Sequence, residues 1–312
     1  MTIHSTSSRK EDFPRYLKLS IVLLVWTAST LRLAGQGPVS GFPTPKGEVA
    51  IALGYGTESY DTYLNPEGNE ARELTATSYN LFIEAGTGDQ TSIILSLPYV
   101  ETNAQNSSLQ DASLWLKYQN VDSRQGRGRH WLFTAIGATF PIGNYPVDGP
   151  FAIGQQAFTM QGRLVYQYQH DDGWFLSAQS GIDFQLSPDS RAIWPVLLRT
   201  GFGGPWFYVE GWLEFVSALD GMQAERTALA GSGSSWTRTG TTLYVPVQPW
   251  AGVFVGGAWI LGGEFIGQSS RFNAGVVFKL GTGQGSRNGR NDIAQRTQWR
   301  AEAPRLGFTQ RR

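Results

Sequence analysis

Residues 156–170, "QAFTMQGRLVYQYQH", alternate between apolar and polar side chains almost without interruption. The apolar side chains of one parity are Phe158, Met160, Leu164, Tyr166 and Tyr168. A period of two residues predicts an extended strand with one apolar face and one polar face. In a soluble sandwich the apolar face would pack on a protein core. In a membrane barrel it would face lipid, and the polar face would line the interior.

The same alternation recurs along most of the chain. We predict about twelve strands, at residues 47–57, 73–86, 91–100, 110–120, 130–141, 156–170, 173–186, 191–203, 205–218, 238–248, 251–261 and 269–280. Many have close to the roughly 9–11 residues that a tilted strand needs to span a bilayer. Pro246 and Pro249 interrupt the pattern between two of these strands, because proline cannot donate a hydrogen bond to a sheet.

The connections between the predicted strands sort by length. The connections from odd to even strands are mostly long: 57–72, 101–110, 142–155 and 219–238. Those from even to odd strands are mostly short: 86–89, 170–173, 203–205 and 248–252. Two connections depart from this rule, since 121–129 is intermediate and 187–191 is short. Outer-membrane barrels have short periplasmic turns and long external loops, whereas a soluble sandwich has no reason to sort its connections.

The pattern therefore predicts an all-β fold, a transmembrane antiparallel up-and-down β-barrel of about 12 strands with both termini in the periplasm. The apolar parity predicts that the following side chains face lipid: Leu164, Tyr166, Leu176, Phe184, Phe207 and Phe215. Aromatic residues near strand ends suit the interfacial girdles of such barrels. These residues are Trp131, Phe140, Tyr168, Trp174, Trp206 and Phe278.

The N-terminus has the parts of a secretory signal peptide. A basic region is followed by an apolar run at 19–29 and by small residues at 33–37. The apolar run is too short to span a membrane as a helix. We therefore expect residues 1–35 to be a signal peptide and residues 36–280 to form the outer-membrane β-barrel. A non-cleaved anchor helix is the alternative for the first segment.

Residues 281–312 differ in composition from the predicted barrel. They contain seven arginines against Asp292 and Glu302, so their net charge is about +5. Their glycine, arginine and glutamine content predicts a basic, disordered periplasmic tail. The alternative is an electrostatic contact of this tail with peptidoglycan or an acidic partner.

Three short motifs occur in a characteristic order. Leu97-Pro98-Tyr99 ends a strand, Asp111 leads a strand that contains Leu116-Lys117-Tyr118, and Phe140-Pro141-Ile142-Gly143 ends the next. In order and spacing they resemble the outer-membrane transporter family named for the MetA pathway of phenol degradation, over residues 47–280. Gln110 stands where the fuller motif has glycine. The resemblance implies a barrel that transports small, hydrophobic or aromatic solutes, and it supplies no catalytic residues.

Catalytic and metal-binding patterns are sparse. The chain has no cysteine and three histidines. His170 begins "HDDG", and we interpret this run as a turn, because turns use aspartate and glycine. No histidine falls within a strand on the inward parity near a serine. We therefore expect no enzyme activity, no cofactor and no metal. The net charge of zero argues against a nucleic-acid partner.

Charged residues on the inward parity are the candidate functional set. The lumen-lining candidates are Lys117, Arg163, Asp183, Arg199, Glu210 and Glu214. From the sixth to the ninth predicted strand the sign of the charge alternates. This set would either form a charged constriction that filters solutes or brace a narrow barrel as a structural network.

Taken with the resemblance, these features predict a channel for passive uptake or release of small, hydrophobic or aromatic solutes, exported to the outer membrane of a Gram-negative bacterium. The expected partners are outer-membrane lipid, a small-molecule solute and the barrel-assembly machinery. Three alternatives are left open: a structural or plugged barrel without pore activity, a barrel enzyme acting on lipid or peptide, and a soluble all-β binding protein.

Overall fold

The computed structural model describes residues 38–64, 67–103, 106–145, 156–188, 190–219 and 230–281. The predicted signal peptide at 1–35 lies outside these residues. The predicted tail at 281–312 also lies outside them, except for Gly281.

The described residues form strands in the following order: β1 (Val49–Leu64), β2 (Glu70–Gly86), β3 (Thr91–Thr102), β4 (Ser107–Leu109), β5 (Asp111–Gln125), β6 (Gly128–Pro141), β7 (Phe158–His170), β8 (Trp174–Ser187), β9 (Arg191–Gly203), β10 (Tyr208–Ala218), β11 (Ala230–Gln248) and β12 (Ala251–Leu280). Across the described ranges, no helix has the length and apolar character that a membrane span requires.

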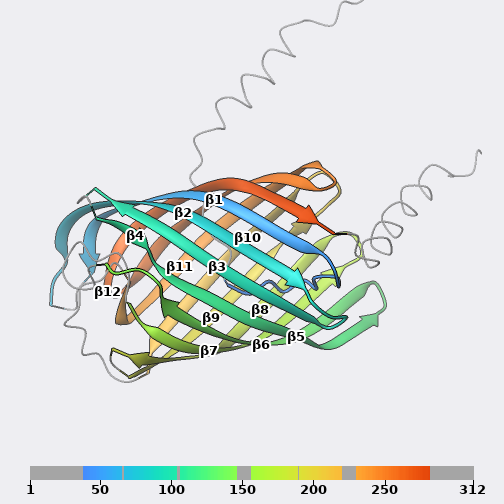
Figure 1. Cartoon of the computed structure of the whole chain (residues 1–312), viewed down its shortest axis with the longest axis horizontal. Helices are drawn as coiled ribbons and strands as arrows, with labels where there is room; N and C mark the ends of the chain where they lie inside the picture. The colour runs from blue at the N-terminus through green and yellow to red at the C-terminus, as the bar shows by residue number, and fades with distance from the viewer. Residues whose placement is uncertain are drawn as a thin grey trace, which may run out of the picture. The chain divides into compact units, whose positions relative to one another are not determined.

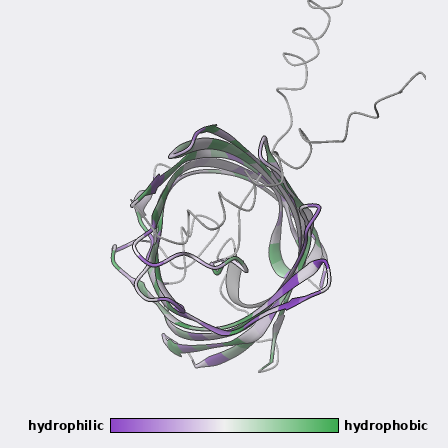
Figure 2. Ribbon diagram, turned by 90° about the vertical axis from the view of Figure 1, so that its right-hand side faces the viewer, coloured by the Kyte–Doolittle hydropathy of each residue, from purple (hydrophilic) through white to green (hydrophobic). Residues whose placement is uncertain are grey.

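The sheet closes on itself. Its order is β2-β1-β12-β11-β10-β9-β8-β7-β6-β5-β3-β4, and an additional pairing of β2 with β3 joins the two ends. All of these pairings are antiparallel, as in β1 with β2 and β2 with β3. Figures 1 and 2 show the resulting closed ring of tilted strands. The short β4 pairs only with the end of β3. A closed ring leaves no free strand edge, which is what a barrel in lipid requires.

The β12 strand contains two antiparallel runs. Eleven of the labelled strands form the ring, and an odd number of single strands cannot alternate in direction around a closed ring. The backbone N–H of Lys279 donates to the carbonyl of Trp250 at 2.7 Å, and the rings of Trp250 and Phe278 stack. Phe265, between the two runs, has a φ of 55°. The chain therefore reverses there and crosses the ring twice within β12, as the predicted strands 251–261 and 269–280 require.

The all-β barrel and most strand positions are confirmed, but three connections differ from the prediction. The connection at 57–72 is shorter, because β1 continues to Leu64 and β2 begins at Glu70. A register shift between Tyr60 and Thr62 breaks the period of two, as a β-bulge does, and it hides this extension in the sequence. Similarly, β11 begins at Ala230 rather than at residue 238.

The connection predicted at 121–129 is a tight turn. The β5 strand continues to Gln125 and β6 begins at Gly128. Gly126 has a φ of 56°, in the left-handed region that glycine occupies at little cost. All connections at this end of the barrel are therefore short. The intermediate connection predicted at 121–129 was an incorrect exception to this rule. We call this end the short-turn end and the opposite end the long-connection end.

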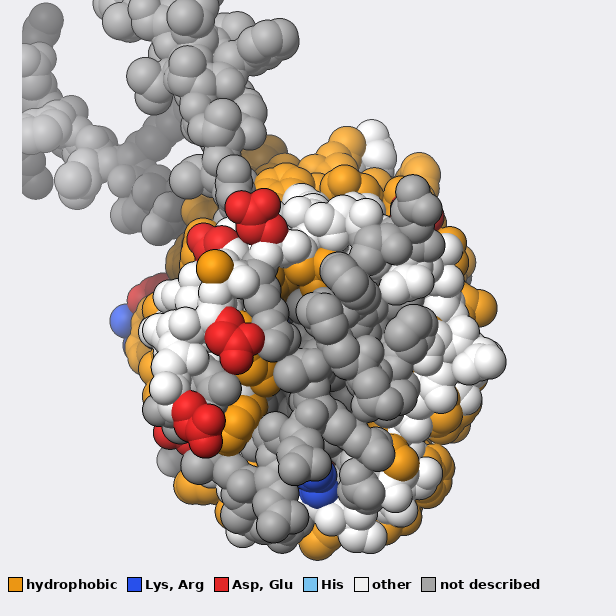
Figure 3. Space-filling model, turned by 90° about the vertical axis from the view of Figure 1, so that its left-hand side faces the viewer, with side chains coloured by type: hydrophobic (Ala, Val, Ile, Leu, Met, Phe, Trp, Pro, Cys, Tyr) orange, Lys and Arg blue, Asp and Glu red, His pale blue; other side chains and the backbone are white. Residues whose placement is uncertain are grey.

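The outer surface of the barrel is apolar. All six side chains predicted to face lipid are well exposed, from Tyr166 at 39% to Leu164 at 53%. Figure 3 looks onto the long-connection end, where apolar side chains surround the wall and carboxylates lie on the rim. Exposed carboxylates near the β1–β2 connection are Asp61, Glu67, Glu70 and Glu73.

One predicted girdle residue is placed wrongly. Trp131 is 4% exposed and lies in the interior core rather than at the outer surface. On β6 the residues of both parities are apolar, so the period of two does not identify the outer face. The register of β6 with its neighbours decides it: Trp131, Phe133 and Ala135 point inward and are buried together.

Candidate functional site in the barrel interior

Most of residues 38–46, which we call the N-terminal segment, lies inside the barrel, and its end reaches the rim, where the exposed Lys46 pairs with Asp89 of the β2–β3 turn. Val39 has no exposed surface and packs in one cluster with residues from β3, β5, β6 and β7. The members of the cluster are Val39, Ile94, Trp115, Trp131, Phe133, Ala135 and Val165. A Cβ on Gly41 would lie 2.2 Å from the Oε1 atom of Gln167, so glycine allows this close approach to β7. The segment therefore covers one side of the lumen wall.

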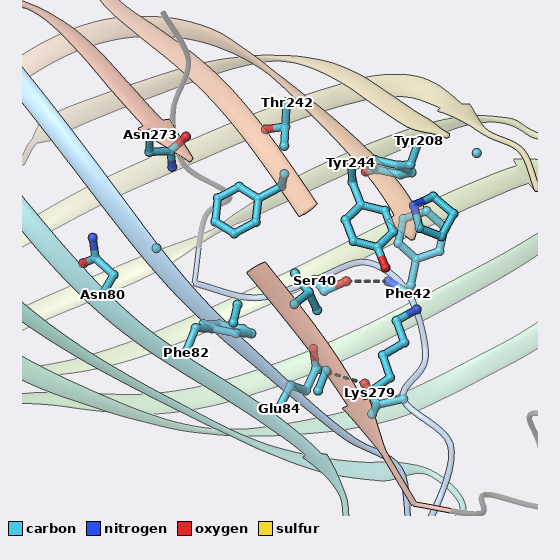
Figure 4. Close-up of a pocket in the computed structure, with 18 of the residues that line it drawn as sticks. Ser40, Phe42, Asn80, Phe82, Glu84, Tyr208, Thr242, Tyr244, Asn273 and Lys279 are labelled. Atoms are coloured by element: carbon cyan, nitrogen blue, oxygen red, sulfur yellow. Dashed lines mark hydrogen bonds between the residues drawn. The ribbon is translucent and has the colours of Figure 1, made fainter. Parts of the chain in front are cut away.

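Lys117 on β5 fastens the N-terminal segment. Its Nζ donates to the carbonyl oxygens of Phe42 at 2.9 Å and Ser40 at 3.4 Å, and to Glu84 Oε1 at 2.5 Å. The hydroxyl of Thr44 also donates to Glu84, at 2.5 Å. Figure 4 shows Ser40 and Phe42 inside the barrel, with Glu84 on the adjacent wall. Both ends of this ion pair are almost fully buried, so it connects the segment to two strands at once.

Three further ion pairs join neighbouring strands inside the barrel. Arg163 on β7 forms a bidentate pair with Asp183 on β8, with an Nη2–Oδ2 distance of 2.8 Å. Arg238 on β11 pairs with Glu214 on β10 at 2.6 Å. The third pair joins β12 to β1, with 2.6 Å between Arg271 Nη2 and Glu58 Oε2. The bidentate Arg163–Asp183 pair fixes the relative position of both side chains, and all three pairs tie neighbouring strands together in the interior.

The structure thus gives partners to four of the six predicted candidates: Lys117, Arg163, Asp183 and Glu214. The sequence analysis missed the residues Glu58, Glu84, Arg238 and Arg271. Glu84 and Arg271 lie on the inward parity of their strands, so parity alone could have identified them. Arg238 begins the predicted strand 238–248 on the parity of Thr242, so parity could have identified it as well. Glu58 falls in the connection predicted at 57–72, where no parity was assigned.

Arg199 and Glu210, the two remaining candidates, are buried without an ion pair. Arg199 is 7% exposed, and its Nη2 has no hydrogen-bond partner among the described residues. Glu210 is 1% exposed and accepts a hydrogen bond from the Tyr208 hydroxyl at 2.7 Å. In the β9–β10 register Arg199 lies opposite Trp212, and Glu210 opposite Gly201. The two charges are therefore close along the strands but not joined.

A cavity of about 660 Å³ occupies the part of the lumen that the N-terminal segment leaves open. Its walls come from β1, β2, the end of β9, β10, β11 and β12, with Phe42 and Ser40 on the segment side. Figure 4 shows Asn80, Phe82, Thr242 and Asn273 around this space. The lining extends to Gly204 and Lys279 near the short-turn end. It therefore includes apolar rings, amides, hydroxyls and charges.

Small inward residues on β1 explain why the cavity lies on this side. The inward parity of "VAIALGYG" is Ala50, Ala52, Gly54 and Gly56, and all four line the cavity. The outward parity carries larger side chains, such as Leu53 and Tyr55, which are 47% and 43% exposed. The part of the wall formed by β5 and β6 instead carries Trp115, Trp131 and Phe133 inward. One half of the barrel is thus filled, and the other half is open.

The two histidines among the described residues, His130 and His170, lie away from this cavity. His170 ends β7 and its ring stacks on Trp174. Its Nδ1 lies 3.3 Å from a carboxylate oxygen of Asp172, within the turn that the sequence predicts. The Nδ1 of His130 lies 2.8 Å from the hydroxyl of Tyr166. Within the described ranges, no three metal-binding side chains are grouped closely enough to hold a metal ion.

Solved structures with this architecture are outer-membrane barrels. The chain is similar to the COG4313 outer membrane channel from Pseudomonas putida F1, with a TM-score of 0.63 and 15% identity over 79% of this chain and 100% of that one. It is also similar to the NanC porin, with a TM-score of 0.50 and 11% identity over 74% of this chain and 100% of that one. At these identities the likeness shows a common fold.

None of the curated proteins matches the chain. The family described as "Putative MetA-pathway of phenol degradation" matches residues 34–203. This match covers the N-terminal segment, the strands from β1 to β9 and all three motifs that carry the resemblance. It also extends over more than half of the 312 residues. On these grounds, the chain belongs to the family of the MetA pathway of phenol degradation.

Proposed function

We propose that the protein is a channel of the outer membrane through which small solutes pass without an energy source. The observation that carries this proposal is the cavity of about 660 Å³ in the lumen, next to a filled half of the same barrel. The apolar outer wall suits lipid. The small inward side chains of β1 keep the space open.

The proposal includes the location and the export route. An apolar belt around a closed antiparallel ring is a solution for crossing the Gram-negative outer membrane. Residues 1–35 would direct export as a signal peptide, and the short-turn end would face the periplasm. The barrel-assembly machinery would insert the chain. In this proposal the basic residues 282–312 form a periplasmic tail.

The lumen charges have two roles in this proposal. The paired set, which includes Lys117, Arg163 and Arg271, braces the wall, because each cation is held by a carboxylate on another strand. Arg199 lines the open cavity without such a partner, so it is positioned to act on solutes. The sequence left two roles open for the inward charges, a solute-filtering constriction and a structural network. In this proposal the paired residues form the network, and Arg199 acts on the solute.

A barrel without pore activity is the second candidate function. It is favoured by the N-terminal segment, because Val39 is fully buried and Lys117 holds two of the segment's carbonyl oxygens. This segment would then act as a permanent plug. An enzyme acting on lipid or peptide has less support, since His130 and His170 do not line the cavity.

The test is the swelling of liposomes that contain the purified protein, with arabinose as an uncharged solute. The wild-type protein should admit arabinose. Ala52→Trp places a large ring in the cavity and should reduce the swelling rate about tenfold or more, because the ring fills space that the solute needs. Leu53→Trp, on the outer face of the same strand, is the matched control and should leave the rate unchanged. Swelling no faster than that of empty liposomes would support the plugged barrel instead.

A further inference from the structure

We propose that the lumen cavity contains a binding site for a small aromatic carboxylate, in which Arg199 binds the carboxylate and the surrounding aromatic side chains contact the ring. This inference rests on the proposed channel function, because it names the class of solute that the lumen holds. It uses the one predicted cation that the interior ion pairs leave unpaired within the described residues.

Arg199 points to an anion. Its side chain lines the cavity and is 7% exposed. No hydrogen bond or ion pair in the described part of the barrel satisfies its Nη2. A buried charge without a partner is costly. The planar guanidinium offers N–H donors in a fork that matches the two oxygens of a carboxylate. A carboxylate in the cavity would therefore complete the interactions that the fold leaves open.

Glu210 does not fill this role. One of its oxygens accepts from the Tyr208 hydroxyl, and the other has no partner among the described residues. It is absent from the lining of the cavity, whereas Arg199 and Tyr208 are part of it. The cavity therefore presents Arg199 and Tyr208, and not Glu210, to a solute.

The ring of the ligand is inferred from the aromatic side chains of the lining. These are Phe42, Phe82, Tyr208, Tyr244 and Phe254. Phe42 contacts Tyr208 edge to face, with 6.2 Å between ring centroids. Figure 4 shows Phe42, Tyr208 and Tyr244 on the same side of the cavity. Aromatic rings pack well in offset and edge-to-face arrangements, so a planar ring suits this lining better than an aliphatic chain.

Two further polar atoms support a polar ligand in the same space. Thr242 and Asn273 line the cavity, and the hydroxyl of the first and the amide oxygen of the second are buried with no hydrogen-bond partner among the described residues. They come from β11 and β12, across from the N-terminal segment. A purely apolar solute would leave these atoms unsatisfied, which is unfavourable.

Binding is measured by isothermal titration calorimetry on the purified full-length barrel in detergent. The probes are benzoate, benzyl alcohol and acetate. Benzoate should bind at least about tenfold more tightly than either of the others, because only benzoate offers both the charge and the ring. Arg199→Gln should reduce benzoate affinity to that of benzyl alcohol. Arg199→Lys should give an intermediate affinity, since lysine keeps the charge but loses the planar fork.

Two variants separate the site from general effects. Arg127→Gln removes the same charge from an exposed residue of the β5–β6 turn and should change benzoate affinity by no more than about twofold, because solvent screens that charge. Phe42→Leu should reduce the difference in affinity between benzoate and acetate, since it removes one aromatic ring from the lining. Migration of heated and unheated samples on gels establishes that each variant is folded.

The inference is overturned if benzoate binds no more tightly than acetate, or if the folded Arg199→Gln variant binds benzoate as tightly as the wild type. It is also overturned if Arg127→Gln lowers the benzoate affinity as much as Arg199→Gln does. If Arg199→Gln does not fold, wild-type affinity in Arg199→Lys is the overturning result. Arabinose swelling distinguishes this failure from failure of the channel. Swelling without benzoate binding would contradict the proposed binding site and support the channel. Benzoate binding without swelling would contradict the channel and support the binding site.

Discussion

At the residue scale, the interior of the barrel depends on where each buried charge finds a partner. Lys117 has three acceptors, two of them on the N-terminal segment. Arg199 has none for its Nη2 among the described residues. The two residues have the same sign of charge, and both are buried, with 2% and 7% of their surface exposed. The presence of hydrogen-bond acceptors, and not the degree of burial, therefore distinguishes a bracing residue from a residue that is available to bind a solute.

Replacing Lys117 with methionine should destabilise the barrel by about 3–5 kcal/mol, because it leaves Glu84 buried without its cation. It should also raise the channel conductance, since the segment loses two of its anchoring hydrogen bonds. The free energy of unfolding from urea titration and the conductance of single channels measure the two effects.

The double variant Lys117→Met with Glu84→Gln is the control for the Lys117 prediction. It removes the unpaired carboxylate, so it should recover part of the lost stability while the conductance stays high. Equal stability of the single and double variants would show that the unpaired Glu84 carboxylate is not what destabilises Lys117→Met.

At the element scale, each strand presents one face to the interior and one to the outside. β8 illustrates this, because Leu176 is 49% exposed whereas its neighbours Phe175 and Ser177 are 1% and 3% exposed. β6 shows the limit of the rule, since its inward residues are as apolar as its outward ones. A strand with one polar face is oriented by its sequence, and a strand with two apolar faces is oriented by its neighbours.

The outer face of β8 gives a test of the lipid contact. Leu176→Arg should cost about 2–4 kcal/mol of folding free energy, because it places a charge in the hydrocarbon layer. Leu176→Ala is the comparison that removes the side chain without adding a charge, and it should cost clearly less. Reversible folding into lipid bilayers measures both values. Equal costs for the two variants would show that this face is not in lipid.

At the scale of the whole molecule, the ring and the N-terminal segment are separable parts. Every strand of the ring is paired on both edges without any contribution from residues 38–46. The segment fills the side of the lumen lined by Trp115 and Phe133 and leaves the cavity on the other side. The channel width is therefore determined by the segment as well as by the number of strands.

Deleting residues 38–46 should leave a closed barrel with a larger lumen. Single-channel conductance should rise, because the segment no longer occupies one half of the interior. Thermal stability should fall, since the cluster around Val39 loses a fully buried side chain. Unchanged conductance in a folded deletion variant would mean that the solute path does not pass the segment.

The sequence alone determined the all-β architecture, the positions of most strands and the lipid-facing side chains. The reason is local, because a period of two residues assigns each side chain to a face wherever the two faces differ in polarity. The alternation of short and long connections indicated a barrel for a similar reason, because the residues of a turn and the length of a connection are read directly from the local sequence. The same parity placed Lys117, Arg163, Asp183, Arg199 and Glu210 among the buried polar residues.

Only the tertiary structure decided which of these charges are paired. The Lys117–Glu84 contact crosses 33 residues of sequence and the Arg271–Glu58 contact crosses 213. Such contacts depend on strand register, and bulges such as that between Tyr60 and Thr62 shift the register. The place of the N-terminal segment was equally hidden, because it has no periodic pattern and is held by Lys117 and the Val39 cluster. The period of a strand is a local property, whereas register and lumen filling arise only when the ring closes.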